Sequence, residues 1–209
     1  MKYKDIIFDL DGTLIDSALG IEESFLYSFS KIYEKKCTKN IKSIIGPPID
    51  EMLFKVNGET NPEKLREFVK EFKLKYDLEG YKKSVMFPNT IEVLSELKER
   101  GLNLFIATNK RELPTDLILK YLEIKQFFKG VYCLDSFEER ITNKSELVRK
   151  LLITYSLGHS ETLLVGDTSN DGLAAEQNKI NFALAQYGYG DYVNSTYKLN
   201  NIQNLVKII

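Results

Sequence analysis

The sequence DIIFDLDGT, residues 5–13, decides the fold class, because a short apolar run leads directly into an acidic turn. The run Asp5-Ile6-Ile7-Phe8 is too short for a helix and shows no alternation of polar and apolar residues. That pattern is typical of a strand buried on both faces of a sheet. The following Asp11-Gly12 pair is a turn signal. The stretch therefore predicts a strand in the centre of a sheet, with carboxylates just past its end.

The same strand-then-helix pattern repeats from residue 85 to the end of the chain. Asn89 and Glu92 have the spacing of a capping box, which predicts a helix that ends at Gly101. Further apolar runs and helical periodicities predict strands at 102–107, 131–134, 162–165 and 181–184, and helices at 113–121, 145–155 and 170–178. Alternating strands and helices indicate an α/β fold, a parallel Rossmann-like sheet with helices on both faces.

Residues 16–84 interrupt this pattern with an all-helical block. Apolar residues recur at helical spacing between Ala18 and Ile32, and a shorter helix is expected around Ile49–Val56. Asn61-Pro62 predicts the start of a third helix, with the asparagine as N-cap and the proline in the first turn. We therefore expect an α/β core from residues 1–15 and 85–209, with a small helical domain inserted at 16–84.

Composition excludes several classes of function. The 209 residues carry 29 Lys and Arg against 30 Asp and Glu, so a basic surface for nucleic acid is not expected. No apolar run approaches the roughly 20 residues of a membrane span, and Met1–Asp5 does not resemble a signal peptide. Two cysteines and a single histidine make neither a disulfide framework nor a zinc site. A cytoplasmic location is expected, and the oligomeric state is left open.

Polar side chains collect where the predicted strands end. Three strands are followed by the segments Asp9-Leu10-Asp11-Gly12-Thr13, Thr108-Asn109-Lys110 and Gly166-Asp167-Thr168-Ser169-Asn170-Asp171. Because parallel strands end at one edge of a sheet, four carboxylates should share one crevice there. Several acids in one pocket repel each other unless a cation joins them, and an all-oxygen site suits Mg²⁺. Lys144, at the start of a predicted helix, would add positive charge for a phosphate.

These segments resemble four motifs of the haloacid dehalogenase-like superfamily. The matching residues, in order, are Asp9–Leu14, Thr108-Asn109, Lys144 and Gly166–Asp171. The helical insert between the first and second motifs resembles the type-1 cap of that superfamily. The run Phe8–Leu14 and the later Gly188-Tyr189-Gly190 are most similar to the phosphoglycolate phosphatase branch.

The resemblance implies a reaction. Asp9 would attack phosphorus and become an aspartyl phosphate, while Asp11 would act as general acid and then as general base. Mg²⁺ would be held by Asp9, Asp167 and the backbone carbonyl of Asp11. Thr108, Asn109 and Lys144 would bind the phosphoryl group, and Asp171 would orient Lys144 and the metal shell. The implied protein is a Mg²⁺-dependent phosphatase for a small phosphorylated metabolite, with the helical cap closing over the site.

The residues leave some alternatives open. Lys144 is followed by Ser145, where relatives usually have proline, and Lys150 is a competing lysine on the same helix. A hexose-phosphate mutase of the same superfamily would use the same pair of acids, Asp9 and Asp11. A haloacid dehalogenase would not need Asp11. A signalling receiver also accepts phosphate on an aspartate, but it is roughly half this length and has no cap.

Overall fold

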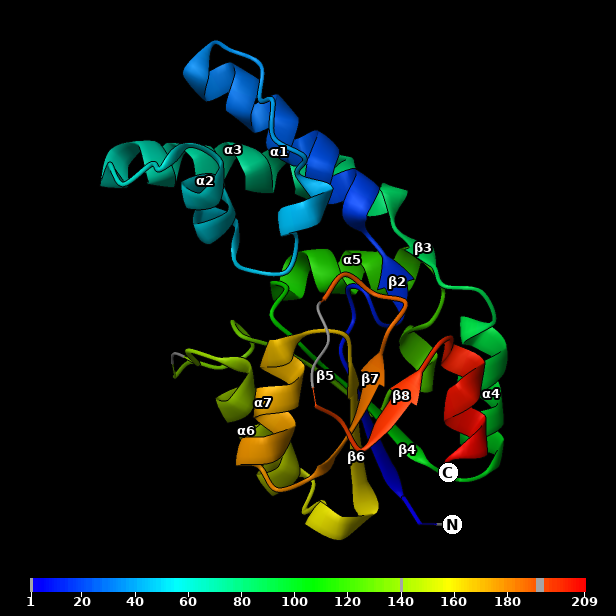
Figure 1. Ribbon diagram of the computed structural model, residues 1–209. Helices are drawn as coiled ribbons and strands as arrows, with labels where there is room; N and C mark the ends of the chain where they lie inside the picture. Colours follow the sequence, from blue (N-terminus) through cyan, green and yellow to red (C-terminus); the bar gives the residue numbers. More distant parts are fainter. Residues whose placement is uncertain (1, 140, 191–193) are drawn as a thin grey trace. The chain divides into compact units, whose positions relative to one another are not determined.

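The computed structural model describes residues 2–139, 141–190 and 194–209. The chain divides into two compact units, residues 1–16 with 86–209 and residues 17–85. The first unit contains a six-stranded parallel sheet with helices, and the second is helical (Figure 1). This confirms the predicted α/β class with an all-helical insert.

The sheet has the strand order β5-β4-β1-β6-β7-β8, and each neighbouring pair is parallel. Its strands are β1 (Asp5–Phe8), β4 (Asn103–Thr108), β5 (Gly130–Cys133), β6 (Thr162–Gly166), β7 (Asn181–Ala185) and β8 (Tyr197–Leu199). A second sheet pairs the short strands β2 (Ile15–Asp16) and β3 (Val85–Met86). The first predicted strand, β1, thus lies between β4 and β6, as expected for a strand with the apolar run Ile6-Ile7-Phe8.

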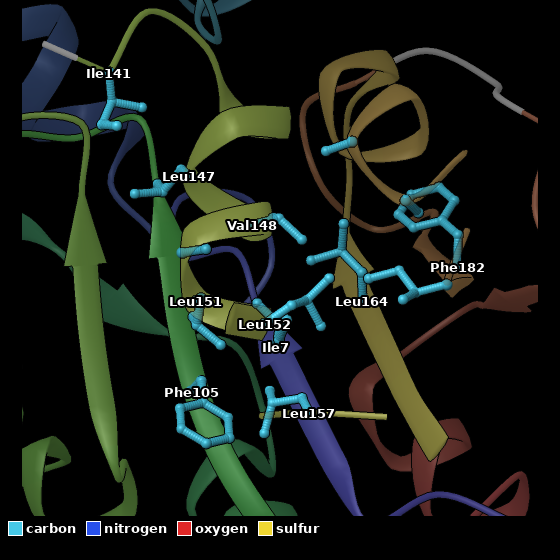
Figure 2. Close-up of a cluster of buried hydrophobic side chains, with 14 of the residues drawn as sticks. Ile7, Phe105, Ile141, Leu147, Val148, Leu151, Leu152, Leu157, Leu164 and Phe182 are labelled. Carbon is cyan, nitrogen blue, oxygen red and sulfur yellow. The ribbon is translucent and has the colours of Figure 1, made fainter. Parts of the chain in front are cut away.

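One face of the sheet carries a continuous apolar row. The strand register places Ile7 opposite both Phe105 and Leu164, and Leu164 opposite Phe182. Helix α6 (Lys144–Thr154) covers this row with Leu147, Val148, Leu151 and Leu152, and helix α7 (Ser169–Gln177) adds two alanines. Figure 2 shows these side chains between α6 and the strands. Burial of this row fixes the register between neighbouring strands, since a shift of one residue would turn every apolar side chain of a strand to the opposite face.

The other face is covered by different elements. Figure 1 shows α4 (Thr90–Glu99) beside the C-terminal 3₁₀ helix η5 (Ile202–Lys207), on the side of the sheet away from α6 and α7. The alternate residues of β1, Ile6 and Phe8, are also fully buried. Helix α5 (Glu112–Tyr121) and the 3₁₀ helices η3 (Lys125–Phe127) and η4 (His159–Glu161) complete this unit. The core sheet is therefore buried on both faces, which explains the apolar run Ile6-Ile7-Phe8 in β1.

The helical unit has its own core. It contains α1 (Ala18–Tyr33), α2 (Ile49–Asn57), α3 (Pro62–Leu78) and the 3₁₀ helices η1 (Lys42–Ile44) and η2 (Gly80–Lys83). Asn61 caps α3 as predicted, since its side chain accepts hydrogen bonds from the backbone N–H groups of Glu63 and Lys64. Buried Phe25 packs edge-on against Phe68, with ring centroids 4.9 Å apart. The apolar stripes read from the sequence are thus the core of this unit.

Two details differ from the sequence analysis. Asn89 precedes α4 with a left-handed backbone, φ 65°, and its side chain makes no capping hydrogen bond, so the predicted capping box is wrong. An N-cap side chain normally reaches the helix from an extended backbone, which Asn89 does not have. Strand β8 and helix η5 at the C-terminal end, like the short strands β2 and β3, were not predicted from the sequence. None of the helices in the described ranges is long and apolar enough to cross a membrane.

Candidate active site

Three strand ends bring the predicted motifs to one edge of the sheet. Asp9 directly follows β1, Thr108 is the last residue of β4, and Asp167 directly follows β6. Because β1 lies between β4 and β6 and all three are parallel, these residues lie at adjacent strand ends. The backbone N–H of Asp9 donates to the carbonyl of Val165 at 2.8 Å, which continues the pairing up to the site. The strand order therefore brings these three residues to one edge of the sheet, where the sequence predicts a crevice.

Lys144 lies at the centre of the acidic residues. It is the first residue of α6, whose start is fixed by Asn143, the side chain of which accepts from the Glu146 backbone N–H at 3.0 Å. The Lys144 ammonium donates to Asp9 Oδ1 and lies 2.6 Å from Asp171 Oδ1. Its side chain is only 3% exposed. Burial lowers the pKa of Lys144, but the two carboxylates outweigh this effect and hold the pKa above its usual value.

The competing lysine lies elsewhere. Lys150, on the same helix, forms an ion pair with the exposed Glu139, and its side chain is 32% exposed. The structure thus brings Lys144, and not Lys150, to Asp9.

The two carboxylate oxygens of Asp167 differ in their hydrogen bonds. Its Oδ2 accepts a hydrogen bond of 2.7 Å from the backbone N–H of Tyr189. Its Oδ1 is buried and has no hydrogen-bond partner among the described residues. A buried carboxylate oxygen without a partner is costly unless a ligand satisfies it. This oxygen is therefore a candidate ligand atom.

Asp9, Asp167 and Asp171 form a buried cluster that fits a cation. Each offers a carboxylate oxygen, and these three oxygens lie within 4.8 Å of one another. Burial, followed by repulsion from the neighbouring acids, raises the pKa of Asp9 to about 8 and that of Asp167 to about 6, although Lys144 partly offsets the rise at both. One lysine among three buried carboxylates leaves excess negative charge, and hard oxygen donors suit a hard divalent cation. The residues present thus fit a metal ion.

Within that cluster Asp171 is already engaged. Its Oδ2 accepts from both the backbone N–H of Thr168 at 3.0 Å and the Thr168 hydroxyl at 2.6 Å, which closes a capping box at the start of α7. Its Oδ1 faces Lys144. Asp171 is thus placed to hold the ammonium of Lys144 in position. The expected third metal ligand, the backbone carbonyl of Asp11, stays a prediction.

The first motif needs a glycine after Asp11. Gly12 has φ +81°, and a Cβ atom at this position would lie 2.1 Å from Asp167 Oδ2. Any other residue would be strained and would displace that carboxylate. Gly12 therefore lets the first loop approach the fourth motif closely.

Asp11 pairs with a lysine to which the sequence analysis gave no role. Lys110 Nζ lies 3.1 Å from Asp11 Oδ2, and the Lys110 side chain is 9% exposed. Lys110 stands two residues after Thr108, and a cation at the same strand end as several acids is the signal that could have identified it. The site thus has a second, half-buried positive charge, next to the expected general acid.

The two polar residues of the second motif lie at the end of β4. Thr108 is buried, and its hydroxyl accepts from the backbone N–H of Lys110 at 3.2 Å. Asn109 Oδ1 is buried and has no hydrogen-bond partner in the described part of the chain. The roles expected for both in binding a phosphoryl group stay predictions.

Two proteins of related sequence cover nearly the whole chain. A 5'-nucleotidase from Pseudomonas aeruginosa is 28% identical over 191 residues, which are 91% of this chain and 86% of the nucleotidase. The pyrophosphatase PpaX from Halalkalibacterium halodurans is 28% identical over 215 residues, which are 100% of this chain and 98% of the pyrophosphatase.

Solved structures agree with the fold. A haloacid dehalogenase-like family hydrolase from Streptococcus pneumoniae superimposes with a TM-score of 0.88 at 26% identity and covers 99% of this chain and 98% of its own. A predicted phosphoglycolate phosphatase from Haemophilus somnus reaches a TM-score of 0.89 at 23% identity, covering 100% of this chain and 98% of its own. That second similarity shows the fold alone.

The matched family covers both units and all four motifs. The model of the haloacid dehalogenase-like hydrolase family matches residues 6–185, which begin in β1 and end with β7. This range contains Asp9, Lys144 and Asp167, the residues that the fold brings together at the edge of the sheet. The chain therefore belongs to the haloacid dehalogenase-like hydrolase family.

Proposed function

We propose that this hydrolase removes phosphate from a small phosphorylated metabolite, in a Mg²⁺-dependent reaction that passes through an aspartyl phosphate on Asp9. The observation that carries the proposal is the placement of Asp9, whose carboxylate is held by Lys144 close to Asp167, and Asp167 Oδ1 has no hydrogen-bond partner among the residues that the structure describes. A nucleophile fixed in this way, next to a position for a cation, is what phosphoryl transfer requires.

In the proposed reaction Asp9 and Asp11 have separate tasks. An oxygen of Asp9 forms a bond to phosphorus as the bond from phosphorus to the leaving oxygen breaks, and Asp11 gives that oxygen its proton. Asp11 then takes a proton from water, which attacks phosphorus and releases inorganic phosphate and free Asp9. Asp11 is half-buried and two residues from Asp9, and Lys110 holds one of its oxygens.

The other residues of the site would bind and orient. Lys144, Thr108 and Asn109 would hold the phosphoryl oxygens, and Asp171 would keep the Lys144 ammonium at Asp9. Mg²⁺ would be held by Asp9, Asp167 and the backbone carbonyl of Asp11, and when bound it would neutralise charge on the phosphoryl oxygens. The all-oxygen donor set favours Mg²⁺ over softer metals.

The names of the relatives indicate a phosphate-containing substrate but do not identify its leaving group. One relative is a 5'-nucleotidase and another a pyrophosphatase, so their names do not agree on a leaving group. The sequence motifs are most similar to the phosphoglycolate phosphatase branch, and we place 2-phosphoglycolate first among the substrates to be tested. Small sugar phosphates, nucleoside monophosphates and pyrophosphate complete the panel.

The test is phosphate release from that panel, with and without Mg²⁺, by wild type, Asp9→Asn and Asp116→Asn. Asp116 is a control because it is a surface acid on α5, paired with Lys120 and Lys125. The proposal expects Mg²⁺-dependent release that is lost in Asp9→Asn and retained in Asp116→Asn. Interconversion of sugar phosphates without release would instead identify a mutase, and stable phosphate on Asp9 without turnover would identify a phospho-accepting signalling protein. Either result overturns the proposal.

A further inference from the structure

A short segment after β7 contacts two of the loops that form the site. Residues 187–190, Tyr-Gly-Tyr-Gly, begin just beyond the end of β7, and we call them the tyrosine loop. The backbone N–H of Gly188 donates to the carbonyl of Ala185 at 3.2 Å, which turns the chain at this point. The proposed reaction gives this loop no task.

The backbone of the tyrosine loop packs directly on Asp167. The Tyr189 N–H donates to Asp167 Oδ2 at 2.7 Å, and a Cβ atom at Gly190 would lie 2.1 Å from the Asp167 carbonyl oxygen. A Cβ atom at Gly188 would lie 2.4 Å from Asp167 Cβ and 2.3 Å from the carbonyl oxygen of Gly12. The glycine thus allows a contact with Asp167 and the first motif that no side chain would permit.

The two tyrosine side chains of the loop reach the first motif. The Tyr187 hydroxyl donates to the backbone carbonyl of Thr13 at 2.9 Å, and its ring packs edge-on against Phe87 with centroids 4.9 Å apart. The Tyr189 hydroxyl donates to Asp16 Oδ1 at 2.7 Å. Both acceptors lie in the segment that directly follows Asp11 and Gly12.

The contacts form a bridge between two loops that are far apart in sequence. On one side the tyrosine loop holds an oxygen of Asp167, and on the other it is attached to the loop that carries Asp9 and Asp11. We propose that the tyrosine loop is a positioning element that fixes Asp167 relative to the first motif, with Tyr187 and Tyr189 as its attachments. The inference rests on the proposed metal-dependent phosphatase and adds what holds its metal ligands at their spacing.

The physical reason is preorganisation. The loop holds Asp167 Oδ2, which restricts rotation of the carboxylate, and Oδ1 has no hydrogen-bond partner among the described residues. A carboxylate that is already ordered loses less conformational freedom when a metal binds. Groups that hydrogen-bond to metal ligands typically contribute about 10- to 100-fold to metal affinity. The tyrosine hydroxyls do not bind Asp167 themselves but hold the loop whose backbone binds it. We therefore expect their effect on Mg²⁺ affinity at the lower end of this range.

The test is Mg²⁺ binding to the metal-free full-length chain by isothermal titration calorimetry. The variant is Tyr187→Phe/Tyr189→Phe, which removes both attachments and keeps both rings. Tyr155→Phe is the matched control, because it also removes one hydroxyl that donates to a backbone carbonyl, that of Lys129 at 3.3 Å. The dissociation constant for Mg²⁺ should rise roughly 10-fold in the double variant and stay unchanged in the control.

A second variant removes the close approach itself. Gly188→Ala should weaken Mg²⁺ binding by more than the double variant, since its Cβ would displace Asp167. If either of these proteins does not fold, the single variant Tyr189→Phe provides the test. With saturating Mg²⁺, phosphate release by the tyrosine variants should return to near the wild-type rate, because the proposal assigns the loop no contact with the substrate.

The outcomes separate the two proposals. Wild-type affinity in the tyrosine variants, while wild type binds Mg²⁺ and releases phosphate, overturns the role of the loop and leaves the phosphatase intact. Wild type that neither binds Mg²⁺ nor releases phosphate overturns both. Weaker binding in the tyrosine variants alone supports the loop as a positioning element.

Discussion

Replacement of Lys144 by methionine should destabilise the protein much more than the same replacement at Lys150. Lys144 is 3% exposed and pairs with both Asp9 and Asp171, which are themselves buried. Removal of one partner from a buried ion pair leaves uncompensated charge and costs about 3–5 kcal/mol of unfolding free energy. Lys150 lies on the same helix but pairs with Glu139, which is 77% exposed. Loss of that surface pair should cost no more than about 1 kcal/mol.

The cost of Lys144→Met should depend on pH. Burial raises the pKa of Asp167 to about 6 even though Lys144 pulls it down, so removal of the lysine raises this pKa further. Between pH 6 and 8 the folded variant then keeps a proton on Asp167 that both the folded wild type and the unfolded chain have released. Stability falls with rising pH wherever the folded state binds more protons than the unfolded chain, so the deficit relative to wild type should be smaller at pH 5 and grow toward pH 8.

Urea unfolding of wild type, Lys144→Met and Lys150→Met at pH 5 and pH 8 measures both effects. The midpoint of Lys144→Met should move to lower urea, more at pH 8 than at pH 5, with an unchanged slope. The three-carboxylate cluster is refuted as the cause if Lys144→Met loses the same stability at both pH values, because an apolar packing defect would not titrate. Equal losses for the two lysine variants would refute the placement of Lys144 in the site.

Two further predictions concern the metal site and the cysteines. Mg²⁺ should raise the melting temperature of the metal-free protein more at pH 8 than at pH 6. Burial raises the pKa of Asp9 to about 8 and that of Asp167 to about 6, so a metal must displace protons from these carboxylates at lower pH. Calorimetry with and without a chelator measures the rise, and a larger rise at pH 6 contradicts the prediction. Burial raises the pKa of the Cys133 thiol to about 11. Iodoacetamide at pH 8 should therefore modify the half-buried Cys37 at least about 10-fold faster than Cys133, as measured by peptide mass spectrometry. Equal rates for the two cysteines would show that Cys133 is accessible.

Much of the fold could be predicted because the strongest signals are local. The apolar run Ile6-Ile7-Phe8 could only be a buried strand, and the Asn61-Pro62 start of α3 follows from the chemistry of the first helical turn. The positions of Asp9 and Asp167 follow from the rule that functional residues lie at the carboxyl ends of parallel strands. In these cases the residues of one short segment are enough to predict its structure.

The missed features depend on residues distant in sequence. The left-handed backbone of Asn89 cannot be read from the Asn-x-x-Glu spacing, because a capping box and a left-handed residue share the same sequence signal. The Lys110 contact with Asp11 joins residues from two different strand ends. Tyr189 and Asp16 are 173 residues apart, so their hydrogen bond needs the folded sheet to bring them together. Such contacts become visible only once the strand order is known.

The buried acids and the apolar core of this sheet have opposite effects on the stability of the fold. A chain selected for stability alone would not place Asp9, Asp167 and Asp171 in one buried cluster, where burial raises the pKa of the first two. The apolar row of Ile7, Phe105 and Leu164 lies below this edge on rigid strands and stabilises the fold independently of the site. Because β1 and β6 carry both features, the same strands that form the core also hold the carboxylates close together against their mutual repulsion. A cation that binds there would relieve this repulsion, so the rigidity of the core is itself part of the reason that the site should bind metal.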